Sequence, residues 1–440
     1  MSTTPEVLEA PAAQDAAPLV RVRDLHIHYR LRANALARLI GGPGATVRAV
    51  DGVNLDLRRG EVLGLVGESG SGKTTLGRAL LGLVRPTSGT IEYDGHDLGR
   101  LSERRLRPLR RRLQMVFQDP HAALNPTMDL LTAVGHPLRV HGLARDRQER
   151  IARVTATLER VGLTPAEQFL RKRPAELSGG QKQRAVIARS VILGPELLVA
   201  DEPISMLDMS VRARILELML ELKRDLNLTY VYITHDLASA KFFCDRVAIM
   251  YLGRIVELGP TEEIFANPRH PYTEALLKAV PDPDPSRPTA RDLPRGEIPD
   301  AAAPPAGCAF HCRCAAAFAP CGWEAPDLRT LLERRWTELG EEVMAAEAPL
   351  VENLTVAPDG TVRLPAPAGH DLSEVTDLLD RMRADTSDDP FWRGVREITS
   401  DAGAVEVRFH PMVIPGLLPV GGVQVACHLH DPNLRPPTQP

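Results

Sequence analysis

The sequence predicts an α/β fold built on a mostly parallel sheet, and three stretches support this prediction. Residues 62–66 (VLGLV) form a short apolar strand that leads through a glycine-rich loop into a helix over 74–83. Two further apolar strands, 197–200 and 229–234, are separated by an amphipathic helix over 211–226. Alternating strands and helices are typical of parallel sheets. Because ligands bind beyond the carboxyl ends of such strands, we expect the functional site there.

The composition favours a soluble, cytosolic protein. The chain has 440 residues, of which 43% are hydrophobic and 25% charged, as in globular proteins of two or three domains. The net charge of −4 gives no electrostatic reason to expect nucleic-acid binding. No apolar run reaches the roughly 20 residues of a membrane span, and the N-terminus lacks the pattern of a secretory signal. We therefore expect a cytosolic chain that can still associate with a membrane protein.

Composition divides the chain into four segments. We expect residues 1–17 to form a disordered lead and residues 18–270 to form the α/β unit, with a mostly helical subdomain over about 119–190. Residues 271–334 hold a proline-rich linker and a cluster of cysteines, and residues 335–440 read as a separate α+β segment whose role the sequence does not indicate. Within that last segment we expect a helix over 372–384 and strands over 404–409 and 422–429.

The loop after the first strand has the spacing of a phosphate-binding loop. Its sequence GESGSGKT, residues 67–74, fits G-x-x-x-x-G-K-[ST] and lies between a strand and a helix, as the motif requires. Glycines let backbone N–H groups approach a phosphate, and the helix start adds a positive dipole end. Lys73 is expected to reach the β- and γ-phosphates, and the Thr74 hydroxyl to bind Mg²⁺. The expected nucleotide contacts here are Gly67, Ser69, Gly70, Gly72, Lys73, Thr74 and Thr75.

Two acids end the strand over 197–200. Asp201 is placed to hold Mg²⁺ through water, and Glu202 is the candidate general base for an attacking water. The alternative is that Asp201 and Glu202 are ordinary charged residues at the end of a strand. The phosphate loop and the apolar run that precedes the two acids disfavour it. Gln118 and His235 also follow apolar stretches, although either one alone would be an ordinary loop or structural residue.

The order of these pieces resembles the ATP-binding cassette of ABC transporters. The motifs are GESGSGKTT, VFQDP, LSGGQKQR, LLVADEP, SMLD and ITHDL, over roughly residues 18–270. The resemblance implies a P-loop ABC ATPase cassette, with a mixed-sheet core and an α-helical subdomain, that binds ATP and Mg²⁺ and hydrolyses ATP. It also implies that two cassettes close face to face over two ATP molecules.

The resemblance implies a role for each motif residue. Gln118 corresponds to the Q-loop residue that senses Mg²⁺ and the membrane partner, and His235 to the residue that contacts the γ-phosphate. With Glu202 these form the expected catalytic set, and the expected Mg²⁺ ligands are Thr74, Gln118 and Asp201. Tyr29 corresponds to the residue that stacks on adenine, Asp208 lies in the D-loop, and the signature residues Ser178, Gly179, Gly180 and Gln181 correspond to the contacts with the nucleotide of the opposite cassette.

The D-loop departs from the family pattern at two positions. Ile204 and Met206 stand where the family usually has threonine and alanine, whereas Ser205, Leu207 and Asp208 follow the pattern. We therefore expect an altered but working D-loop.

More narrowly, the chain resembles the ATPase subunits of oligopeptide, dipeptide and nickel importers. This resemblance is carried by residues 117–120 with 124–126, by 267–273 (NPRHPYT), and by 307–314 with Cys321. It implies a peripheral protein at the cytoplasmic face of the inner membrane. The implied partners are a second ABC ATPase subunit, two transmembrane permease subunits and, through these, an extracytoplasmic solute-binding protein; no nucleic acid is expected. The alternative is a soluble, non-transport ABC ATPase with a redox-sensing C-terminal module.

The cysteine cluster consists of Cys308, Cys312, Cys314 and Cys321, with Cys312 at a position where the family usually has proline. Four soft ligands suit Zn²⁺ or a [4Fe–4S] cluster, but the spacing matches neither a zinc ribbon nor a bacterial ferredoxin. The family resemblance favours iron–sulfur, with zinc and unligated cysteines as alternatives. Such a metal would stabilise a segment with little core of its own. We interpret the separate stretch Cys427–His430 as alternating residues on a strand.

Overall fold

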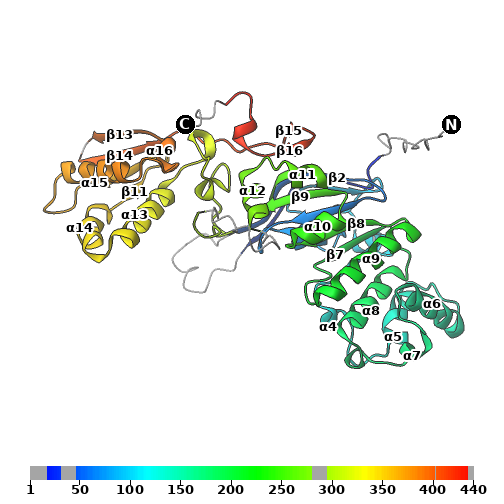
Figure 1. Cartoon of the computed structure of the whole chain (residues 1–440). Helices are drawn as coiled ribbons and strands as arrows, with labels where there is room; N and C mark the ends of the chain where they lie inside the picture. Colours follow the sequence, from blue (N-terminus) through cyan, green and yellow to red (C-terminus); the bar gives the residue numbers. More distant parts are fainter. Residues whose placement is uncertain (1–16, 31–45, 280–294, 402, 435–440) are drawn as a thin grey trace, which may run out of the picture.

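The central sheet is mixed and has eight strands. A computed structural model describes residues 17–30, 46–279, 295–401 and 403–434 (Figure 1). The strand order is β15-β16-β10-β9-β3-β8-β7-β6, and the five strands from β9 to β6 are parallel. The predicted parallel core is therefore confirmed. The bounds are β3 Val62–Val66, β6 Leu113–Val116, β7 Leu197–Asp201, β8 Thr229–Thr234, β9 Arg246–Tyr251, β10 Arg254–Pro260, β15 Leu418–Val420 and β16 Val423–Val425.

The central strands are buried on both faces, because successive side chains alternate between two hydrophobic cores. Leu63 and Leu65 of β3 enter one core, whereas Val62 and Val66 enter the other. Helix α2 (Lys73–Leu80) packs closely on one face, since a Cβ at Gly77 would lie 2.7 Å from the Ile233 side chain. Helices α9 (Met209–Leu226), α10 (Leu237–Phe243) and α11 (Thr261–Ala266) complete the unit around the sheet.

Two further units complete the cassette. An antiparallel sheet of order β2-β1-β4-β5 packs its apolar side into the core shared with α2. Its strands are β1 Val20–Arg30, β2 Thr46–Leu57, β4 Ser88–Tyr93 and β5 His96–Asp97, and α3 (Glu103–Leu109) follows them. Five helices form the predicted helical subdomain at one end of the molecule (Figure 1): α4 Pro120–Ala123, α5 Leu130–Val140, α6 Arg147–Arg160, α7 Glu167–Leu170 and α8 Gly179–Val191.

The C-terminal residues form a module with its own core, at the opposite end of the molecule from the helical subdomain (Figure 1). Helix α12 (Pro271–Lys278) precedes the cysteine-rich segment, and the module follows it with a sheet of order β11-β12-β14-β13. Its elements are α13 Ala325–Leu339, α14 Glu341–Val351, β11 Thr355–Val356, β12 Val362–Pro365, α15 Leu372–Asp385, α16 Phe391–Gly394, β13 Val395–Asp401 and β14 Ala404–Phe409.

The structure corrects two expectations for this region. The predicted boundary at 335 falls inside α13, and the last strands, β15 and β16, leave the module to join the edge of the central sheet beside β10. The predicted strand over 422–429 is shorter, because β16 ends at Val425 and residues 428–430 form a 3₁₀ turn. Helix 372–384 and strand 404–409 are confirmed. Among the helices of the described segments, none combines the length and apolarity needed to cross a membrane.

The module core offers a stability test. Leu378 on α15 is 0% exposed, so Leu378→Ala should lower the module's free energy of unfolding by about 2–5 kcal/mol. The chain's three tryptophans, Trp323, Trp336 and Trp392, all contact this core, so tryptophan fluorescence during urea unfolding reports on the module. The control Leu378→Met conserves volume and should cost less than about 1.5 kcal/mol. Equal midpoints for both variants would contradict the assigned core.

Candidate functional site

The phosphate-loop conformation depends on glycine at two positions. Gly67 and Gly72 have φ values of 157° and 96°. A Cβ at Gly67 would lie 2.2 Å from the Met250 carbonyl oxygen, and one at Gly72 would lie 2.0 Å from that of Ala49. Both contacts are too short for any side chain. The loop therefore approaches the neighbouring backbone closely just before α2 begins.

The loop curls around the ammonium group of Lys73. The Lys73 Nζ donates to the carbonyl oxygens of Gly67 and Glu68, each at 2.8 Å, and to the Ser71 Oγ at 3.3 Å. Burial lowers the pKa of Lys73, and the nearby carboxylates of Glu202 and Asp201 partly offset this effect. A buried cation with few acidic contacts of its own is suited to binding an anion such as phosphate.

Thr74 and Asp201 meet across the first turn of α2 and the end of β7. The Thr74 Oγ1 donates to the Asp201 Oδ1 at 3.0 Å. Asp201 is 4% exposed, and burial raises the pKa of its carboxyl group. Both residues and Gln118 line one cleft of about 900 Å³. Hydroxyl, carboxylate and amide oxygens are the kind of donors that suit Mg²⁺.

The structure brings Gln118, Glu202 and His235 together. The Glu202 carboxylate accepts a hydrogen bond from Gln118 Nε2 at 3.0 Å and lies 2.8 Å from His235 Nδ1, so it joins the ends of β6, β7 and β8. Glu202 has a φ of 45°, a conformation that costs a non-glycine residue energy. Its N–H donates to the Ile233 carbonyl at 2.9 Å, which holds this backbone in place. Such strain concentrates at functional sites.

The signature residues lie on the helical subdomain, at the start of α8. Ser178 caps this helix: its Oγ accepts from the Gln181 N–H at 3.3 Å, and its own N–H donates to the Gln181 Oε1 at 3.0 Å. The Gln181 side chain, expected at the nucleotide, is thus engaged in a capping box. Within the described residues, no hydrogen bond joins these signature residues to the phosphate loop of the same chain.

The D-loop lies beside the signature. A Cβ at Gly179 would lie 3.6 Å from the Leu207 side chain, and one at Gly180 would lie 2.8 Å from Val211. Asp208 stands at the start of α9 and is exposed. Met206 and Met209 flank it and are 61% and 83% exposed. Exposed apolar side chains of this size, gathered around a motif, indicate a contact surface.

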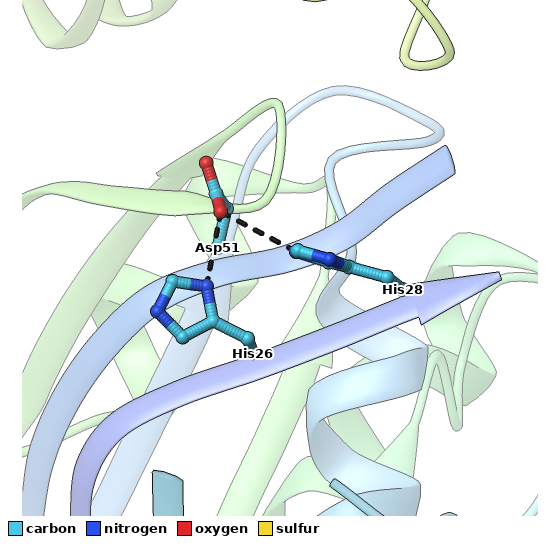
Figure 2. A group of neighbouring side chains, drawn as sticks. All are labelled: His26, His28 and Asp51. Carbon is cyan, nitrogen blue, oxygen red and sulfur yellow. Dashed lines mark hydrogen bonds and ion pairs between the residues drawn. The ribbon is translucent and has the colours of Figure 1, made fainter. Parts of the chain in front are cut away.

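Tyr29 lies near the end of β1 and is 43% exposed. A charged network supports the same strand pair (Figure 2): Asp51 Oδ1 lies 3.1 Å from His26 Nδ1 and 3.4 Å from His28 Nε2. Arg254 donates to the other Asp51 oxygen at 2.7 and 3.0 Å. Burial alone would raise the pKa of Asp51, but Arg254 outweighs it and the pKa is lowered. Since Arg254 already neutralises this carboxylate, the network serves to join β1 and β2 to β10.

The cysteine cluster differs from the predicted set. One small cavity is lined by the thiols of Cys308, Cys314, Cys321 and Cys427. Cys312 lies in a 3₁₀ turn (His311–Arg313) and does not line this cavity; it lines a neighbouring pocket beside Asp327, which Cys314 also lines. The predicted grouping of Cys312 with Cys308, Cys314 and Cys321 stays a prediction, and the structure adds Cys427 to the last three. Sequence analysis placed Cys427 on a strand and missed its contact with this cavity. The two residues Cys321 and Cys427 are more than a hundred residues apart in sequence, and only the fold brings them together.

Two histidines border the same thiol cavity. His428 Nδ1 lies 3.5 Å from Cys321 Sγ, and His270 lines the cavity from the start of α12. The Nε2 atoms of both rings are buried without a hydrogen-bond partner. Burial raises the pKa of Cys308 and Cys321 to about 12, so these thiols are protonated unless a cation displaces the protons.

The structure suggests a test of the loop geometry. Gly72→Ala should raise the Kd for MgATP by at least about tenfold, because its Cβ would strike the Ala49 carbonyl. Gly70→Ala is the matched control: its φ is 79°, but the added Cβ meets nothing within 4 Å. A fluorescent ATP analogue titrated against both variants gives the two values. A larger loss for Gly70→Ala than for Gly72→Ala would contradict this account.

Comparisons with known proteins place the chain in a family. The ABC transporter family model matches residues 50–205, and the model of the oligopeptide/dipeptide transporter C-terminal region matches residues 256–321. A putative peptide import ATP-binding protein of Brucella ovis is 46% identical over 312 residues, covering 71% of this chain and 94% of that protein. The oligopeptide transport ATP-binding protein OppF of Salmonella typhimurium is 43% identical over 312 residues, covering 70% and 92%.

Solved cassettes also match. The dimeric post-hydrolysis structure of the cassette MJ0796 bound to ADP and Pi is 29% identical, covers 55% of this chain and 98% of its own, and has a TM-score of 0.49. The family assignment rests on the sequence relatives. The chain belongs to the family of ATP-binding subunits of oligopeptide/dipeptide ABC transporters, and it is an ABC ATPase.

Proposed function

We propose that this chain energises an importer of oligopeptides, dipeptides or related small solutes. The observation that carries the proposal is the convergence of Thr74 with Asp201, and of Glu202 with Gln118 and His235, at one edge of the sheet. The match of residues 256–321 to the peptide-transporter C-terminal region supports a transport role over that of a soluble, non-transport ATPase.

We assign the residues of the phosphate loop and of the adjoining strand ends the following roles in ATP hydrolysis. The loop N–H groups of Gly67 to Thr75 and the Lys73 ammonium bind the β- and γ-phosphates. Thr74, Asp201 and Gln118 would hold Mg²⁺, which neutralises phosphate charge. Glu202 orients the attacking water and accepts its proton. His235 holds the Glu202 carboxylate and is positioned to contact the γ-phosphate.

A second ATPase subunit completes the site. The signature residues Ser178, Gly179 and Gly180, together with Gln181 and the D-loop Asp208, do not reach the phosphate loop of their own chain within the described hydrogen bonds. We infer that they face the ATP of a partner cassette, whether a second copy or a related chain. ATP then favours the closed pair because it contacts both subunits only in that state. Tyr29 would stack on the adenine ring.

The membrane partners follow from the same role. The cassette pair would bind two permease subunits from the cytoplasmic face of the inner membrane, as a peripheral protein. The cleft beside Gln118 is lined by nucleotide-site residues on one side and by α4 of the helical subdomain on the other. Gln118 would therefore link the nucleotide site to the helical subdomain. A solute-binding protein outside the membrane would deliver substrate to the permeases. Substrate choice would then lie with these partners.

Glu202→Gln tests the assigned base. Binding of MgATP should remain as in the natural chain, whereas ATP turnover should fall at least about a hundredfold because the amide cannot accept the proton. The measurements are steady-state phosphate release and the Kd of a fluorescent ATP analogue. The matched control is Glu217→Gln, an exposed position on α9 that should leave turnover unchanged. Turnover at the natural rate in Glu202→Gln would refute the assignment.

We further propose that Cys308, Cys314, Cys321 and Cys427 hold a [4Fe–4S] cluster. Four thiols around one buried cavity supply the ligands that such a cluster needs. A single zinc would place its thiolates about 3.8 Å apart, given Zn–S bonds of about 2.3 Å. Within the described residues, no three cysteine sulfurs lie within 4.8 Å of one another, and the cavity between the four thiols measures about 10 Å³, so the side chains must move to hold either metal. The cluster would supply structural or redox-sensing chemistry and take no part in ATP hydrolysis.

Cysteine variants separate the two ligand sets. Cys427→Ser should lose the iron and the visible absorption of the anaerobically purified protein, because it removes one of the four thiolates that face the cavity. Cys312→Ser should retain both, since Cys312, unlike Cys314, does not line the cavity of the four thiols. Iron and zinc contents measured by mass spectrometry distinguish the metals. Natural protein without iron would reject the cluster, and loss of iron in Cys312→Ser alone would restore the sequence-based set.

A further inference from the structure

Glu68, the residue after the first loop glycine, is held through its backbone at two points. Its carbonyl oxygen accepts a hydrogen bond from Lys73 Nζ at 2.8 Å, so it helps to place the ammonium group. Its N–H donates to the Tyr272 hydroxyl at 3.0 Å, and Tyr272 belongs to α12, at the start of the C-terminal extension. The position of the lysine therefore depends on how Glu68 is fixed.

The Glu68 side chain is held by an arginine of the cysteine-rich segment. Arg313 donates to the two Glu68 carboxylate oxygens at 3.1 and 3.4 Å, across 245 residues of sequence. Arg313 is 8% exposed, and it also contacts the Tyr251 hydroxyl at 3.4 Å. This is a two-point pairing of a buried guanidinium with a carboxylate, the geometry that gives arginine its specificity.

Aromatic packing fixes the direction of Arg313. Its guanidinium carbon lies 5.9 Å from the Tyr251 ring centre and 5.8 Å from that of Phe310. The rings of Tyr251, Tyr272 and Phe310 pack on one another with centres 4.6 to 5.3 Å apart. Strand β9, helix α12 and the cysteine-rich segment each contribute one ring, so the three elements form one rigid support behind the loop.

We propose that Arg313 is a positioning residue for ATP binding: by fixing Glu68 it sets the backbone carbonyl that holds Lys73. The cysteine-rich segment is then a structural part of the nucleotide site. Arg313 is the residue between Cys312 and Cys314, and Cys314 lines the thiol cavity. The proposal holds whether or not the cysteines bind a metal.

The energetic argument lies in the burial of Arg313, whose side chain is 8% exposed, whereas the Glu68 side chain is 26% exposed. Removing the partner of a buried charge leaves that charge uncompensated, which is more costly than losing an exposed pair. Without Arg313, the Glu68 carboxylate would turn toward solvent and shift the carbonyl that Lys73 uses. Without the Glu68 charge, Arg313 would lose its two-point partner. Both changes should therefore act on the same step, the binding of the ATP phosphates.

The experiment is a double-mutant cycle on the full chain. Arg313→Met and Glu68→Gln should each raise the Kd and KM for MgATP by about tenfold, and the double variant should be no worse than either one. The turnover number should change much less than KM, because Glu202 and His235 are untouched. Arg313→Lys should recover part of the affinity. The matched control Arg334→Met removes a contact with Asp389 in the C-terminal module, and it should leave the Kd unchanged.

Thermal unfolding of each variant separates positioning from general stability. A natural Kd in Glu68→Gln, which conserves size, would overturn the proposal even where Arg313→Met fails to fold. Independent, additive losses in the double variant would also overturn it. A control Arg334→Met that loses affinity together with its melting temperature would show that stability alone explains the effect. Failure of the unmodified chain to support peptide uptake, together with the expected Kd changes in the variants, would count against the transport role and leave this inference intact.

Discussion

The buried ammonium group of Lys73 is the constraint on which the rest of the site depends. A cation removed from water must be compensated, and here the loop carbonyls of Gly67 and Glu68 provide the contacts. The parallel strands bring Asp201 and Glu202 near enough to act on its pKa. Burial removes the water that would stabilise the charge of the ammonium group, and the negative charges of bound ATP would stabilise that charge in its place. The loop glycines, the ends of the parallel strands and the start of α2 together fix the position of the Lys73 ammonium group.

The cassette and the C-terminal extension share this geometry. Tyr272 and Arg313 both contact Glu68, so residues after the α/β unit complete the support of its phosphate loop. The module from α13 to β14 differs, because it has a hydrophobic core of its own and lies away from the cassette (Figure 1). It interrupts the chain between Cys321 and Cys427, two residues that line one cavity. The thiol cavity thus brings together the chain segments that enter and leave this module.

Sequence reasoning succeeded where the signal is local. The phosphate loop, Asp201 and Glu202 adjoin short apolar strands, and the parallel sheet then brings strand ends together without further information. It failed where contacts span long stretches of chain. Neither Glu68 with Arg313 nor Cys427 with Cys308 has a sequence signature that identifies its partner. Gln181, which we expect at the nucleotide of a partner cassette, caps α8 in this structure, and its contact with a nucleotide stays a prediction.

The central claim is that this ATPase works as one half of a cassette pair attached to a transporter. A gentle detergent purification of the chain from its native membranes, with every co-purifying protein identified, tests it most directly. The account predicts two permease subunits and a second ATPase subunit, or a second copy of this one, in stoichiometric amounts, with a solute-binding protein recovered through the permeases. Recovery of soluble partners alone would contradict it.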